Sequence, residues 1–162
     1  FIAISEKVYQ RWDLFRDEVK LAERAFRGIY QPVYYGRIGL RYRDVLDRDE
    51  LDLQGCSWSE LLNHSFIGEL GAEALTGEVE DIRTQSLVRL PDVLNGMVRI
   101  QHGLTRTPDS EKRVYVIDSD FYTAEKTELD DAFQKLDIFN RWAGRLFRWA
   151  ISDRLRDALG PT

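Results

Sequence analysis

The sequence predicts an α+β domain, with a mostly antiparallel sheet and helices packed against it. Three strand-like runs are joined by short turns, which is typical of an antiparallel meander; they cover about residues 82–90, 96–106 and 113–121. An earlier run, residues 33–46, alternates apolar and polar side chains with the period of a half-buried strand. The chain then ends in a long segment of helical periodicity, about residues 128–159. The expected element order is β-α-β-α-β-β-β-α.

The first half of the chain supplies the other strand and two helices of this order. Residues 1–4 predict a short strand, and apolar side chains at three- and four-residue spacing predict a helix over residues 6–27. A serine and a glutamate three residues apart form a capping box and predict a helix over residues 58–70. The residues expected at these helix boundaries are Ser5, Gly28 and Ser57.

The terminal helix is longer than a domain of this size needs. Thr127 is its expected cap and Gly160-Pro161 its end. About 32 residues at about 1.5 Å each give about 48 Å, whereas a chain of this length folds to a diameter of roughly 40 Å. We therefore expect this helix to bend, near Gly144, or to overhang. The turn Thr107-Pro108-Asp109-Ser110 precedes the last meander strand.

A second apolar stripe on the terminal helix is a candidate interface. It consists of Ile138, Trp142 and Trp149 and lies apart from the broad stripe that would face the sheet. Two exposed tryptophans on one stripe are unusual for a soluble monomer. We therefore expect at least one of them to be buried, against the sheet, an N-terminal region of the same protein or a second subunit.

Bulk composition narrows the class of protein. A chain of 162 residues with a net charge of −5 predicts a single domain over residues 1–162 and no general nucleic-acid binder. The single cysteine, Cys56, fits a reducing cytoplasm. No apolar run approaches the roughly 18 residues of a membrane span. Because Phe1-Ile2-Ala3-Ile4 reads as half a strand, we expect the C-terminal part of a longer protein.

Charged residues lie on the polar side of two predicted strands. The candidate binding residues are Arg37, Arg41, Arg43, Asp118 and Asp120. Period-2 alternation places Leu40 and Tyr42 in the core and Arg41 on the other face, within ion-pair reach of one of the aspartates. These residues form either a structural ion-pair ladder or a polar site. Further arginines and two tyrosines could extend them into an anion or single-strand nucleic-acid platform: Arg89, Arg99, Arg106, Tyr35 and Tyr42.

The sequence matches catalytic and metal-binding motifs only weakly. Asp118-Ser119-Asp120 is similar to the strand-end acidic motif that holds a metal and a sugar nucleotide in some glycosyltransferases, but those enzymes need alternating strands and helices upstream. Cys56 with His64 or His102 could pair as nucleophile and base, although a structural thiol is the simpler interpretation. We expect no metal, no cofactor and no phosphate loop.

The strand Gly39-Leu40-Arg41-Tyr42 carries a family resemblance. Together with Tyr9, Trp12 and the Ile117-Asp118 strand end, it resembles an uncharacterised, sporadically distributed family of bacterial proteins. The resemblance implies a longer protein with an N-terminal region, a bacterial cytosolic setting and no assigned activity. Phe139-Asn140 departs from a Leu-His pair common in that family, which weakens the idea of a catalytic histidine there.

These observations favour a non-catalytic binding or assembly module whose partner is a second copy or another protein. One alternative is a metal- or anion-dependent enzyme using Asp118 and Asp120 with nearby arginines. Another is an apolar ligand binder in which an antiparallel sheet grips the long helix, as in helix-grip proteins. A filled core, a large cavity or unpaired converging carboxylates would distinguish these alternatives.

Overall fold

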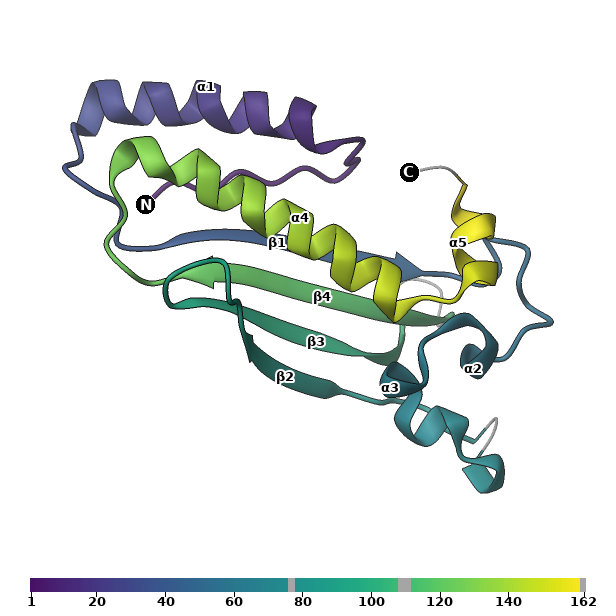
Figure 1. The fold of residues 1–162 in the computed structure, drawn as a ribbon. Coiled ribbons are helices and arrows are strands. Elements are labelled where there is room, and N and C mark those ends of the chain that lie inside the picture. Colours follow the sequence, from purple (N-terminus) through teal and green to yellow (C-terminus); the bar gives the residue numbers. More distant parts are fainter. Residues whose placement is uncertain (76–77, 108–111, 161–162) are drawn as a thin grey trace.

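The computed structural model describes residues 1–75, 78–107 and 112–160. Its strands are β1 (Ile38–Leu46), β2 (Thr84–Arg89), β3 (Gly96–Arg106) and β4 (Arg113–Thr123). Within the described residues they form a four-stranded antiparallel sheet in the order β1-β4-β3-β2 (Figure 1). The predicted α+β class and the β2-β3-β4 meander are therefore confirmed.

The helices lie along one face and one end of this sheet. They are α1 (Trp12–Tyr30), α2 (Trp58–Leu61), α3 (His64–Ile67), α4 (Ala132–Ala150) and α5 (Asp153–Leu159), with short 3-10 turns η1 (Gly68–Gly71), η2 (Glu73–Leu75) and η3 (Leu129–Asp131). Helix α4 packs over β1 and β4, and α1 lies beside the first half of α4 (Figure 1). Among the described helices, none has the length and apolar character needed to cross a membrane.

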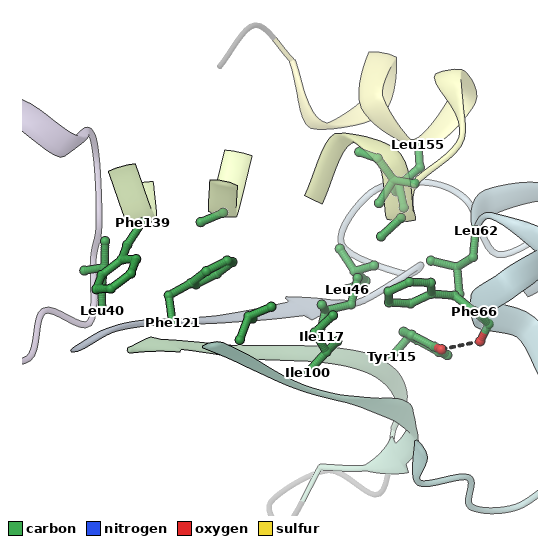
Figure 2. Close-up of a cluster of buried hydrophobic side chains, with 14 of the residues drawn as sticks. Leu40, Leu46, Leu62, Phe66, Ile100, Tyr115, Ile117, Phe121, Phe139 and Leu155 are labelled. Carbon is green, nitrogen blue, oxygen red and sulfur yellow. Dashed lines mark hydrogen bonds between the residues drawn. The ribbon is translucent and has the colours of Figure 1, made fainter. Parts of the chain in front are cut away.

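The core lies between α4 and the sheet and is filled by large side chains. Phe139 from α4 is 0% exposed, and Phe121 and Ile117 from β4 are 1% exposed (Figure 2). Leu40 is buried and Tyr42 partly buried on the same face of β1, as the alternation predicts. The apolar alternation of the strands therefore forms one continuous layer under the helix.

The terminal helix breaks, but not at Gly144. Helix α4 ends at Ala150, Ile151 is extended and bridges Leu62, and the Ser152 side chain caps α5. The predicted single helix over residues 128–159 is therefore wrong, because the Ala150 carbonyl and the Ser152 amide form hydrogen bonds with the segment around Leu62 instead of continuing the helix. The predicted cap is also wrong, since Glu128 and Asp131 take the cap positions of η3 and α4. Pro161 lies outside the described residues.

The N-terminal elements also differ from the prediction. Residues 1–4 form no strand, since their backbone pairs with no strand in the described residues. Helix α1 begins after Arg11 instead of Ser5 and continues through Gly28. It ends at Tyr30, and the C-cap residue Gln31, which precedes Pro32, has a left-handed φ of 43°.

The segment predicted as one helix over residues 58–70 is broken as well. Glu60 accepts a hydrogen bond of 2.7 Å from the Ser57 backbone, as the capping box requires. Leu62 then leaves the helix to pair with Ile151, and the Asn63 side chain caps α3. Strand β1 begins at Ile38, so the predicted strand over residues 33–46 is too long at its start. The Pro108-Asp109-Ser110 turn lies outside the described residues.

Candidate functional site: the open face of the sheet

The sheet face opposite α4, called here the open face, carries the predicted charged residues. Arg41 donates two hydrogen bonds to Asp118, from Nε at 2.7 Å and from Nη2 at 2.5 Å. Arg37 Nη2 lies 3.1 Å from an Asp120 oxygen. The predicted proximity of Arg41 to one of these aspartates is therefore confirmed, and the structure brings both charged strands together as an ion-pair ladder.

Gly39 allows this arrangement. A Cβ atom on Gly39 would lie 3.1 Å from Arg37 Nη1 and 3.3 Å from the Phe121 carbonyl oxygen. The Arg37 side chain therefore extends over the glycine, along the strand, to reach Asp120. A larger residue at position 39 would displace the Arg37 guanidinium, which explains physically why an arginine and a glycine two residues apart occur together in this strand.

The ion pairs are diagonal rather than directly opposite. In the strand register Arg41 lies opposite Asp120 and Arg43 opposite Asp118. Because Arg37 reaches Asp120 across Gly39, Arg41 pairs with Asp118 instead. Arg43 is then exposed, and no described residue forms a hydrogen bond or ion pair with it. Because both aspartates are paired with other arginines, Arg43 is left without a carboxylate partner at the end of the ion-pair ladder.

Strands β2 and β3 add two more arginines to the open face. Arg99 of β3 lies opposite Asp120 of β4, and Arg89 of β2 lies opposite Met97 of β3, so the register places both arginines on this side. Both are exposed and form no ion pair with a described residue. The Arg37 and Arg99 guanidinium carbons lie 4.8 and 5.9 Å from the centre of the Tyr122 ring. Tyr122 is therefore the aromatic residue associated with these arginines.

The remaining members of the proposed anion platform lie elsewhere. Tyr42 is on the opposite face, where its hydroxyl donates a 2.9 Å hydrogen bond to Asn140 of α4. Tyr35 donates a hydrogen bond to Glu23 of α1. Arg106 pairs with Glu80. The exposed arginines of the open face form an arginine cluster that consists of Arg37, Arg41, Arg43, Arg89 and Arg99.

A groove of about 980 Å³ follows the outer edge of β1. Its floor is the continuous run Arg37–Asp44. The N-terminal segment and one side of α1 form facing walls, and the start of α4 also lines the groove. The apolar lining residues of the two helices are Trp12, Phe15, Val19, Ala132, Phe133 and Leu136. No wall residue of α1 is buried, so this helix stands partly away from the sheet.

Asp44 is a lining residue of this groove whose carboxyl group is partly buried. It lies on the helix side of β1 and forms no hydrogen bond or ion pair with a described residue. Burial, with a smaller contribution from the nearby Asp118 carboxylate, raises the pKa of Asp44 to about 6. The carboxylate form of this residue is therefore destabilised in the folded protein at neutral pH.

The second stripe of α4 is less buried than expected. Trp149 is 51% exposed and contacts Phe66 edge-on at 5.3 Å between ring centres. Trp142 is partly buried and donates a 3.2 Å hydrogen bond to Asp92, and Ile138 is also partly buried. Neither tryptophan is fully buried within the described residues, and burial of one of them against an N-terminal region or a second subunit stays a prediction. The stripe faces partly towards the β2–β3 turn instead of packing fully into the core.

An aromatic cluster at the other end of the sheet was not predicted. His102 stacks on Phe66 at 4.1 Å between ring centres, and its Nδ1 lies 2.7 Å from the Tyr115 hydroxyl. That hydroxyl donates a 2.5 Å hydrogen bond to the Phe66 carbonyl (Figure 2). Burial lowers the pKa of His102. The cluster joins α3 to β3 and β4, and only the tertiary contact of α3 could have indicated it.

The side chains capable of metal or nucleophile chemistry do not converge. Within residues 1–75, 78–107 and 112–160, no three His, Cys, Asp or Glu side chains gather in a way that could hold a metal ion. Asp118 and Asp120 are engaged by arginines, and Cys56 is buried. The open face therefore presents cations and hydrogen-bond donors.

Comparison with known proteins found no matching family model, curated protein or solved structure. The resemblance to a bacterial family through Gly39-Leu40-Arg41-Tyr42 therefore stays a prediction.

Proposed function

We propose that this protein is a non-catalytic binding module that holds an acidic protein partner on its open sheet face. The observation that carries the proposal is the charge of that face. Five arginines stand there with two aspartates, although the whole chain has a net charge of −5. Arg43, Arg89 and Arg99 are exposed without a counter-ion among the described residues. An acidic partner would supply those counter-ions.

The chemistry of the open face favours carboxylates on a protein. Guanidinium groups bind carboxylates through paired hydrogen bonds, as Arg41 already does with Asp118. Leu87 and Val45, 56% and 52% exposed, add apolar area to the same face. A nucleic acid is less favoured, because the chain is acidic overall and Tyr122 is already covered by two arginines.

The two alternative functions have weaker support. An enzyme using Asp118 and Asp120 would need free carboxylates, but both accept hydrogen bonds from arginines. A helix-grip ligand binder would need space between α4 and the sheet, where Phe139 and Phe121 are fully packed. The groove lies instead at the β1 edge, where the start of α4 lines it with Ala132, Phe133 and Leu136, and neither Phe139 nor Phe121 borders it. We also assign the module to the bacterial cytosol, which the buried free Cys56 supports.

The proposal is tested with a fluorescent hexaglutamate peptide and fluorescence anisotropy at low salt. Binding should weaken by at least about tenfold between roughly 50 and 300 mM NaCl, because exposed charges are screened. Arg43→Gln and Arg99→Gln should each weaken binding several-fold. Arg141→Gln is the matched control, since Arg141 is also exposed but lies on α4, across the sheet.

Three results would contradict the proposal. The peptide could fail to bind at low salt, or the three arginine variants could weaken binding equally. A single-stranded DNA oligonucleotide of equal charge could also bind more tightly than the peptide, which would favour the nucleic-acid platform. Light scattering on the same samples measures whether a second copy of the chain occupies the open face, in which case mass should fall in Arg43→Gln.

A further inference from the structure

Strand β1 is an edge strand with an unused side. It pairs with β4 on one side only, and no other described segment forms a backbone hydrogen bond to it. Backbone amides of a strand alternate between its two edges, so about half of those in β1 point away from β4. Such an edge is a template for another extended segment.

The groove of about 980 Å³ runs along this unused edge. Eight consecutive residues, Arg37–Asp44, line it. Neighbouring side chains in a strand point to opposite faces, so a continuous run can line one groove only if the groove follows the strand's edge. A residue in a sheet occupies roughly 160 Å³, from a rise of about 3.3 Å, a strand spacing of about 4.8 Å and a sheet thickness of about 10 Å. The groove therefore matches about six residues of added strand.

The two sides of the groove differ in chemistry. On the helix side the groove meets the apolar rings and methyl groups of Trp12, Phe15 and Val19. On the open face it meets Arg37, Arg41 and Arg43, of which Arg43 has no counter-ion among the described residues. A strand placed here would project alternate side chains towards an apolar wall and towards arginines.

We propose that the β1 edge binds an extended segment of another protein as a fifth strand, and that this segment alternates apolar with acidic residues. The proposal rests on the function proposed above and specifies its partner. Main-chain hydrogen bonds to β1 would provide affinity, and the alternation would provide specificity and register. The chain's own N-terminal segment lies in the groove wall, but it forms no backbone hydrogen bond to β1, and its Glu6 forms no ion pair with Arg43.

Peptides of equal composition separate strand addition from simple charge attraction. Both labelled peptides are six residues long. In one, valine and glutamate alternate, and in the other, three valines are followed by three glutamates. The alternating peptide should bind the full chain at least about tenfold more tightly by anisotropy. Arg43→Gln should weaken this binding several-fold, whereas Arg141→Gln should leave it unchanged.

Backbone methylation tests the hydrogen bonds directly. Only alternate amides of an added strand face β1. N-methylation of the amides that face β1, either those of the valines or those of the glutamates, should therefore abolish binding. N-methylation of the other set should leave binding intact. Amide hydrogen exchange should also slow in β1 when the alternating peptide binds. Equal binding of the two unmethylated peptides, with continued dependence on Arg43, would overturn strand addition and leave the acidic-partner function intact. Absence of binding by either would overturn both.

Discussion

The two faces of the sheet have the same backbone and opposite chemistry. The helix side buries Leu40, Ile117 and Phe121 beneath α4, whereas the open face exposes the arginine cluster around two aspartates. Burial of apolar area stabilises the first face at about 25 cal/mol per Å². Exposed ion pairs contribute much less, because water and salt screen them. We therefore expect substitutions on the helix side to change stability and substitutions on the open face to change binding.

The largest effect should come from the centre of the helix side. Phe139→Ala removes a ring that is 0% exposed and should lower the free energy of unfolding by about 3–5 kcal/mol in urea titration. Leu87→Ala is the control on the open face, where the side chain is 56% exposed; it should change stability by less than about 0.5 kcal/mol. Similar losses in the two variants would mean that another molecule or segment covers the open face.

Asp44→Asn should act in the opposite direction. The pKa of Asp44 is raised to about 6 in the folded chain, so ionising this residue destabilises the folded state. This free-energy cost is absent near pH 4, grows between about pH 4 and 6, and is complete at pH 7. The variant should therefore be about 1–3 kcal/mol more stable than wild type at pH 7 and equal to it near pH 4. His102 titrates in both proteins, so the difference between their unfolding free energies isolates Asp44. A destabilised variant at pH 7 would show that the Asp44 carboxylate is stabilised by a partner.

The ladder of the open face should have a smaller effect. Arg41 and Asp118 are 62% and 13% exposed at their side chains, so their paired hydrogen bonds should contribute about 0.5–1 kcal/mol. A double-mutant cycle with Arg41→Gln and Asp118→Asn measures this coupling, which should decrease at high salt. A coupling above about 2 kcal/mol would mean that the pair is desolvated, contrary to an open face.

Divalent cations should have no measurable effect. Mg²⁺, Mn²⁺ or Ca²⁺ at millimolar concentration should leave the melting temperature unchanged, since the open-face aspartates accept hydrogen bonds from Arg37 and Arg41. A site filled at about 100 times its Kd would add about 2.7 kcal/mol. An increase of several degrees that disappears in Asp118→Asn would favour the metal-dependent enzyme instead.

Local sequence patterns determined the strands and their faces. Period-2 alternation in β1 and β4 correctly placed Leu40 inside and Arg41 beside an aspartate, because side-chain direction in a strand follows from the backbone alone. The meander β2-β3-β4 could likewise be predicted from turns between adjacent strands. These features depend on neighbours in the chain.

Tertiary structure decided the features that need a distant partner. The terminal helix breaks at Ile151 because Leu62 pairs with it, and Phe1-Ile2-Ala3-Ile4 forms no strand because no described strand pairs with it. The diagonal pairs that leave Arg43 without a counter-ion depend on the β1–β4 register and on the space above Gly39. Apolar and charged patterns indicate which face a residue occupies, but the partner across that face is set by how separate elements pack.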